Sequence, residues 1–105
     1  MARFTGERTD ARRGVIFVWR GYAHARMYSE QNAYDDYTLA INSEDISEHY
    51  LKYALYQRAT INYNLGKHDL AYEDFVQIVE LDPDYKNASK WLHWLDPDRH
   101  SQAEH

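Results

Sequence analysis

The sequence contains no cysteine, and this absence excludes several kinds of protein at once. Disulfide frameworks, thiolate zinc sites, iron–sulfur clusters and cysteine nucleophiles all require cysteine, so this chain of 105 residues has none of them. A reducing compartment is compatible with such a composition, and we expect a cytoplasmic protein.

Proline, glycine, basic residues and long apolar runs are also scarce. With two Pro and four Gly, the composition favours long regular elements over a turn-rich β architecture. The longest apolar stretch, Val15 to Trp19, is far too short to cross a bilayer, so we expect no membrane insertion. Lys and Arg number 12 against 17 Asp and Glu, and the net charge of −5 argues against binding of nucleic acid through its phosphates.

Aromatic residues, in contrast, are abundant. Ten Tyr, three Trp and three Phe make up 15% of the chain. The hydrophobic share of 44% and the charged share of 28% are close to globular averages. A length of 105 residues suits one compact domain, so we expect a single folded domain whose unusual feature is its aromatic content.

An internal repeat organises the chain. When the sequence is shifted by 38 residues, Phe17–Gly21 (FVWRG) aligns with Leu55–Ala59 (LYQRA). In the same register, Ala33–Tyr37 (AYDDY) aligns with Ala71–Phe75 (AYEDF). The alignment needs no insertion or deletion between the two matching blocks, so one unit occurs twice in the chain.

The spacing of apolar residues predicts two helices in each copy of the unit. Steps of three and four residues predict first helices over residues 9–28 and 47–65, each joined by a short turn to an antiparallel second helix. A fifth helix is predicted over residues 85–95. Residues 1–8 and 97–105 lack periodicity and are expected to be flexible tails.

Capping residues indicate where these helices begin and end. In the second copy, Ser47 is expected to cap the first helix, and Gly66 to end it in the left-handed conformation. Asp69 is expected to cap the following helix, which Pro83 then terminates. Asp84 is the expected cap of the fifth helix.

These residues resemble the tetratricopeptide repeat (TPR) family. The second copy carries the family's pattern at matching spacings, with Leu55, Ala59, Gly66, Ala71, Phe75 and Pro83. The first copy retains Phe17, Gly21, Ala33, Tyr37 and Ala40. It has Tyr28 in place of the turn glycine and Asp45 in place of the closing proline, and the period is 38 rather than the usual 34 or so.

The resemblance implies an all-α fold of TPR-like helical hairpin repeats. Two hairpins, about residues 14–45 and 48–84, would be followed by a C-terminal capping helix over 85–95. Together they would form one domain over residues 9–96. In this family such hairpins stack as a right-handed superhelix.

Small residues recur where the two helices of a hairpin must approach closely. Gly21 is expected to face Ala33 in the first copy, and Ala59 to face Ala71 in the second. Larger side chains then fill the space beside these crossings. The aromatic residues assigned to packing are Phe17, Tyr37, Phe75 and Trp91.

Arginine and aspartate recur at identical offsets in the two copies. Arg20 with Asp36, and Arg58 with Asp74, occupy opposite helices of their hairpins, and we expect each pair to form an ion pair that fixes the helix register. The alternative is that these arginines bind a ligand.

The TPR resemblance implies that the first helices line a concave groove that binds a peptide or a partner helix. Tyr and Trp combine a large contact area with a hydrogen-bonding tip, so an aromatic groove suits recognition. The predicted partner-binding residues are Tyr22, Arg26, Tyr56, Thr60, Tyr63, Asn64, Lys90 and Trp94. The alternative that Tyr22, Tyr56 and Tyr63 mainly pack against neighbouring helices stays open.

Some TPR domains capture a C-terminal carboxylate with a Lys/Asn clamp. The corresponding positions here hold Val18, Tyr22 and Thr60, and only Lys90 fits the clamp. We therefore expect no specific capture of acidic chaperone tails.

Catalysis has little support in the sequence. The histidines are scattered, without a carboxylate and a nucleophile in a recognisable order, so we expect no enzyme, no catalytic residue, no cofactor and no metal. A structural subunit that forms a homodimer is the alternative to peptide binding. Its contacts would be the apolar run Val15–Trp19 or the end of the chain that carries Trp91 and Trp94.

Overall fold

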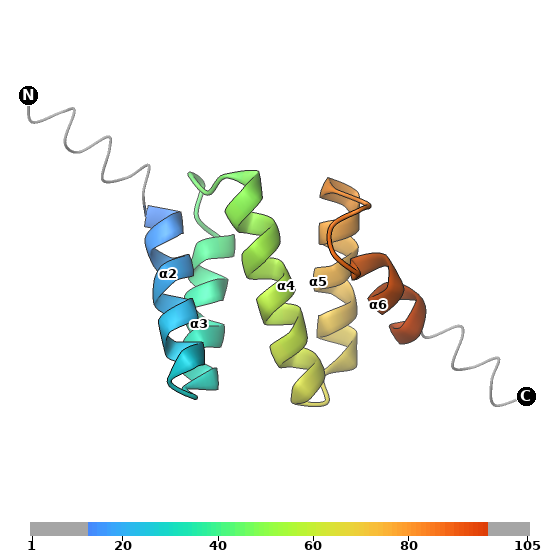
Figure 1. Cartoon of the computed structure of the whole chain (residues 1–105), viewed down its shortest axis with the longest axis horizontal. Coiled ribbons are helices and arrows are strands. Elements are labelled where there is room, and N and C mark those ends of the chain that lie inside the picture. The colour runs from blue at the N-terminus through green and yellow to red at the C-terminus, as the bar shows by residue number, and fades with distance from the viewer. Residues whose placement is uncertain (1–12, 97–105) are drawn as a thin grey trace, which may run out of the picture. The chain divides into compact units, whose positions relative to one another are not determined.

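The computed structural model describes residues 13–96, which form five helices and no strand (Figure 1). They are α2 (Arg13–Arg26), α3 (Glu30–Ile41), α4 (Glu48–Asn64), α5 (His68–Leu81) and α6 (Ala88–Leu95). The predicted all-α class is therefore confirmed for this part of the chain. The predicted tails, 1–8 and 97–105, and the predicted first residues of the first helix, 9–12, lie outside the described residues.

The chain divides into two compact units within α4, one up to Ala54 and one from Leu55. The first unit contains α2, α3 and the early turns of α4. The second contains the rest of α4 together with α5 and α6. Each helix within residues 13–96 is too short or too polar to span a membrane.

The core of each hairpin is built around a small residue at the helix crossing. In the first unit, a Cβ atom added to Gly21 would lie 2.8 Å from Cε1 of the Tyr37 ring, so only glycine fits there without a shift of the buried ring. In the second unit, Ala59 and Ala71 are fully buried with Phe75. Of the four aromatic residues assigned to packing, Tyr37 and Phe75 are thus buried, whereas Phe17 and Trp91 are only half-buried.

The turns of the two hairpins have the same backbone geometry. Tyr28 has φ of 60° and Gly66, its counterpart in the repeat, has φ of 80°. After each turn, a backbone N–H donates over 2.8 Å to a carbonyl of the preceding helix, from Ser29 to His24 and from Lys67 to Asn62. Gly66 ends α4 in the left-handed region as predicted, and Tyr28 adopts that conformation without the glycine that normally makes it inexpensive.

Each hairpin also carries the predicted ion pair. The Arg20 Nη2 nitrogen donates to Asp36 Oδ1 over 2.7 Å, and Arg58 Nη2 donates to Asp74 Oδ1 over 2.7 Å. Asp36 and Asp74 are both buried. A buried carboxylate needs hydrogen-bonded partners, and each arginine supplies them across its hairpin, so the two predicted ion pairs are confirmed.

The residue four positions after the paired arginine differs between the two copies. His24 Nδ1 donates to Asp36 Oδ2 over 2.7 Å, whereas the equivalent Asn62 lies 3.5 Å from Asp74 Oδ2. The Arg58 guanidinium makes up for the weaker Asn62 contact by binding both carboxylate oxygens of Asp74. In addition to the Nη2 bond, its Nε donates to Asp74 Oδ2 over 3.0 Å.

Asp45, which stands where the family pattern has its closing proline, anchors the loop after α3. Its two carboxylate oxygens accept from the backbone N–H groups of Arg13 and Gly14, each over 3.2 Å. Gly14 permits this approach, since a Cβ there would come within 2.9 Å of Ile46 Cβ. A hydrogen-bonded carboxylate thus replaces the proline in the first copy.

Two predicted caps are wrong. Lys67 is the N-cap of α5, and Asp69 lies inside its first turn, where its charge favours the helix dipole instead. Asp84 does not cap the last helix, which begins at Ala88 rather than Tyr85, with Asn87 as its N-cap. The reason is the backbone of Lys86, whose φ of 45° delays the helix. Ser47, in contrast, caps α4 as predicted, since its Oγ accepts from the Tyr50 N–H over 3.4 Å.

Candidate functional site

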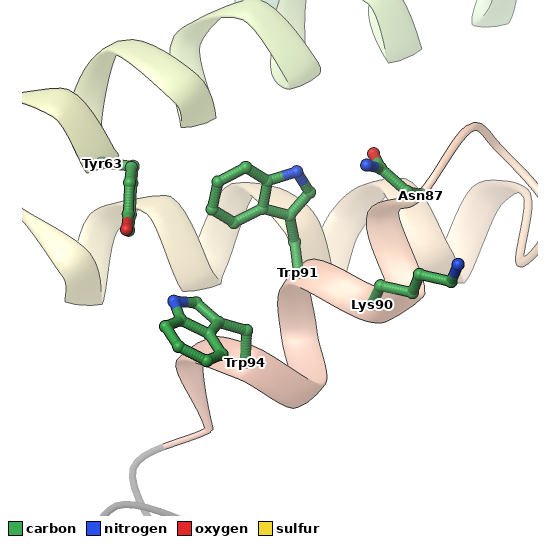
Figure 2. Close-up of a pocket in the computed structure, with 5 residues that line it drawn as sticks. All are labelled: Tyr63, Asn87, Lys90, Trp91 and Trp94. Carbon is green, nitrogen blue, oxygen red and sulfur yellow. The ribbon is translucent and has the colours of Figure 1, made fainter.

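Five side chains of the second unit surround a pocket of about 340 Å³ (Figure 2). One comes from the end of α4 and four from the N-cap and the exposed side of α6. They are Tyr63, Asn87, Lys90, Trp91 and Trp94, and we call them the α6 pocket. The last four follow the spacing i, i+3, i+4 and i+7, which places them on one face of a helix.

The floor of the α6 pocket is held by the core. The Trp91 ring stacks on buried Phe75, with centroids 5.2 Å apart and planes 6° apart, and meets the Tyr63 ring edge-on at 4.8 Å. Tyr63 in turn stacks on His68 at 5.0 Å. These contacts fix the aromatic walls before any ligand arrives, and fixed walls lower the entropic cost of binding.

The pocket has an aromatic end and a polar end. Tyr63 and Trp94 lie at one end, Asn87 and Lys90 at the other, and Trp91 lies between them (Figure 2). Trp94 leaves 50% of its surface exposed. This arrangement can take an apolar side chain at one end and hydrogen-bond acceptors or negative charge at the other.

The polar end carries a positive charge, and a tyrosine forms a hydrogen bond to its asparagine. The Tyr56 hydroxyl donates to the Asn87 carbonyl oxygen, which leaves the amide N–H groups of Asn87 to donate elsewhere. The Lys86 ammonium lies 5.2 Å from the centre of the Tyr56 ring, a cation–π distance. Within residues 13–96, neither Lys86 nor Lys90 has a carboxylate within ion-pair distance.

The structure brings three of the eight predicted binding residues together in this pocket: Tyr63, Lys90 and Trp94. Tyr56 adjoins it through Asn87. Thr60 does not contribute its hydroxyl, which donates to the Gln57 carbonyl over 2.8 Å. Asn64 is exposed at the end of α4 and is not among the side chains that line the pocket.

The remaining two predicted residues, Tyr22 and Arg26, belong to the first unit. The Arg26 guanidinium lies 5.8 Å from the Tyr22 ring centre. Tyr22 borders a second, aromatic pocket of about 370 Å³. Its lining residues are Val18, Trp19, Tyr22, His49, Tyr50 and Tyr53, and we call them the α2 pocket. The predicted groove includes residues from both units. The structure places three of its second-unit residues at the α6 pocket and Tyr22 at the α2 pocket, each within a single unit.

Packing and recognition are not exclusive for these aromatic residues. Tyr56 is half-buried, with its ring edge-on to Phe75 at 5.6 Å and to Tyr85 at 6.1 Å. Tyr63 is also half-buried, yet it lines the pocket. The packing alternative therefore describes Tyr56 best, whereas Tyr63 both packs and remains accessible.

Sequence reasoning missed Asn87 and treated Trp91 as core alone. The spacing of 87, 90, 91 and 94 was a usable signal, but a helix predicted from Tyr85 with Asp84 as its cap concealed the role of Asn87. Trp91 was assigned to packing correctly, since it stacks on Phe75, but one face of the same ring borders the pocket. In the first unit, the reasoning also missed His49 and Tyr50.

Titratable side chains are common in this part of the chain, but they do not gather into a metal-binding cluster. Among residues 13–96, no three His, Asp or Glu side chains come together in a way that could hold a metal ion. His24 is engaged with Asp36 inside a hairpin, where it helps to satisfy a buried carboxylate.

Comparison with known proteins identified no relative. A scan against protein-family models, a search of curated proteins and a search of solved structures each found no match.

Proposed function

We propose that this chain is a noncatalytic, cytoplasmic protein-interaction module of TPR-like type that binds a peptide or partner helix. The α6 pocket is the observation that carries the proposal. It joins fixed aromatic walls to an amide and an ammonium group, and it remains open to solvent at Trp94. Such mixtures of aromatic area and hydrogen-bonding tips are characteristic of binding hot spots.

The TPR-like part of the proposal is supported by the agreement between the two copies. Both turns place a residue in the left-handed region at the same repeat position, Tyr28 and Gly66. Both hairpins carry an arginine–aspartate pair at the same offset. A helical unit that occurs twice with the same turn geometry and the same arginine–aspartate pairing suits a repeat architecture, whose usual role is to present a surface to another protein.

A selection from a random peptide library against the full chain tests this function. We expect peptides to be enriched on the wild-type protein and to be lost on a variant with Lys90→Ala and Trp94→Ala, both of which change exposed residues. Trp19→Ala is the matched control, because Trp19 is a comparably exposed tryptophan in the first unit. The proposal would be contradicted if no peptide were enriched, or if the same peptides were enriched equally on the wild-type protein and on the variant.

A second candidate function is self-association through α2. Ile16, Trp19 and Tyr22 follow each other on one side of this helix and leave 51%, 58% and 40% of their surfaces exposed. Burial of this apolar strip against a second copy would be favourable, at about 25 cal/mol per Å² of apolar surface.

Sedimentation velocity on the full chain separates the two candidates. Self-association predicts a dimer at tens of micromolar that Trp19→Ala converts to a monomer, whereas Trp94→Ala leaves its mass unchanged. A wild-type protein that stays monomeric across that range would rule out the second candidate.

A further inference from the structure

We propose that the α6 pocket recognises an acidic peptide segment, with a bulky apolar side chain at its aromatic end and a carboxylate at its lysine end. This inference rests on the proposed function and names the chemistry of the partner. The carboxylate that we assign is that of a side chain beside the apolar anchor.

The apolar half of the inference follows from the shape and walls of the site. A volume of about 340 Å³ has room for one large side chain with its neighbouring backbone, and is at the small end for a ligand pocket. Trp91 cannot turn away, because its ring is stacked on Phe75 in the core. An aromatic or aliphatic side chain placed against Trp91 and Trp94 would bury apolar surface on both rings, and the Trp91 ring is already held in place.

The acidic half follows from charge complementarity. Lys90 is the only charged residue in the lining, and Lys86 lies outside the lining, over the ring of Tyr56, whose hydroxyl bonds Asn87. No described carboxylate pairs with either ammonium group, although the protein as a whole has a net charge of −5. A positive rim in an acidic protein attracts acidic segments to this end of the molecule and repels basic ones.

Asn87 adds direction to the same end. Its carbonyl oxygen is occupied by the Tyr56 hydroxyl, so the amide presents donors rather than an acceptor. Donors from Asn87 and Lys90 suit a carboxylate or a peptide carbonyl. An amine or guanidinium from the ligand would find no carboxylate among the side chains that line the pocket.

Nuclear magnetic resonance of the ¹⁵N-labelled full chain tests the inference, because each of the three tryptophans gives its own indole N–H signal. Trp19→Phe and Trp94→Phe assign two signals and leave the third to Trp91. The probes are three peptides blocked at both ends, each with a central phenylalanine flanked by glutamates, glutamines or lysines. Adenosine monophosphate serves as a fourth probe, since a base and a phosphate could also use a ring and a lysine.

The glutamate peptide is expected to move the Trp91 and Trp94 signals and to leave Trp19 unmoved. Its affinity should exceed that of the glutamine peptide by roughly two- to fivefold per lysine engaged, as for exposed ion pairs, and the advantage should shrink at high salt. The lysine peptide should bind more weakly than either. Because both termini are blocked, binding would not depend on a C-terminal carboxylate.

Substitution of both lysines isolates the charge. Lys86→Gln with Lys90→Gln should erase the preference for glutamate over glutamine while the apolar anchor still binds. Lys67→Gln, an exposed lysine at the α4–α5 turn whose side chain forms no capping bond, is the matched control and should keep the preference.

Several results would overturn the inference. They are equal affinities for the three peptides, tighter binding of adenosine monophosphate, movement of the Trp19 signal instead, or no movement with any probe. If library-selected peptides bind through Trp94 regardless of their charge, the acidic partner is wrong and the proposed function survives. If the library also yields no peptide, both fail together.

Discussion

At the scale of single residues, the two buried aspartates are neutralised and hydrogen-bonded by different partners. Asp36 receives Arg20 on one oxygen and His24 on the other, whereas Asp74 receives both prongs of Arg58. Burial by itself would raise the pKa of Asp36, but the hydrogen bonds from Arg20 and His24 outweigh it and hold that pKa below its ordinary value. The charged form of Asp36 is therefore the one that stabilises the first hairpin.

This lowered pKa predicts a loss of stability in acid. A carboxyl whose pKa is lower in the folded state contributes stability above its unfolded pKa of about 4 and loses that contribution as the pH falls through the folded value. Asp36→Asn should lower the free energy of unfolding at neutral pH by about 1–3 kcal/mol and should flatten the decline below pH of about 4. Urea unfolding of both proteins over this range is the measurement, and parallel pH profiles would contradict the assignment.

Tyr37 carries a second residue-scale prediction. Its side chain is 1% exposed, and its hydroxyl forms no hydrogen bond of good geometry, although the Tyr53 side chain lies close enough to interact with it. The repeat places Phe75 at the equivalent position, so the pocket for this ring needs no hydroxyl. Tyr37→Phe should raise the free energy of unfolding by about 1 kcal/mol, because a buried unsatisfied polar group is removed at constant shape.

Thermal unfolding followed by circular dichroism measures this change. The reverse exchange, Phe75→Tyr, is the matched comparison and should lower the melting temperature, since it buries a new hydroxyl beside Trp91. A Tyr37→Phe protein that melts well below wild type would show that the hydroxyl has a partner after all.

At the scale of elements, the two hairpin turns share a left-handed backbone conformation, but only one of them has the glycine that favours it. Gly66 occupies the left-handed region at little cost, whereas Tyr28 occupies it with a side chain that is 95% exposed and contributes almost no packing. The surrounding turn, including the Ser29 to His24 hydrogen bond, holds Tyr28 in this conformation.

Exchanges at the two turns should therefore have opposite effects. Tyr28→Gly removes the left-handed penalty but adds entropy to the unfolded chain, and we expect a net gain of about 0.5 kcal/mol in the free energy of unfolding. Gly66→Ala introduces the penalty and should cost about 1 kcal/mol. Chemical denaturation decides both values, and a Tyr28→Gly protein less stable than wild type would refute the strain at this turn.

The helices were the most predictable feature, and their ends were less so. Apolar spacing and Ser47 predicted a helix over residues 47–65, and α4 spans Glu48–Asn64. The start of α6 escaped prediction because it depends on the left-handed backbone of Lys86, a conformation that lysine itself does not favour. Because the helix was predicted to begin too early, Asn87 was not recognised as its N-cap or as a residue of the candidate site.

At the scale of the whole molecule, each of the two units carries its own pocket lined by aromatic residues. Tyr63, Trp91 and Trp94 gather in the α6 pocket, and a separate aromatic set forms the α2 pocket. Composition indicated the excess of rings, and the repeat assigned Tyr37 and Phe75 to the core. Sequence spacing alone could not show that one Trp91 face packs while another borders a pocket, because that depends on the tertiary contact with Phe75.

The affinity of one library-selected peptide for three forms of the full chain tests the interaction-module account most directly. Isothermal titration calorimetry would compare wild type, Trp94→Ala and Trp19→Ala, two exposed tryptophans that lie in different units. We predict that Trp94→Ala weakens binding by about tenfold or more, as expected for a hot-spot residue, and that Trp19→Ala changes the Kd by less than about twofold. Equal losses in both variants, or a loss confined to Trp19→Ala, would contradict the account.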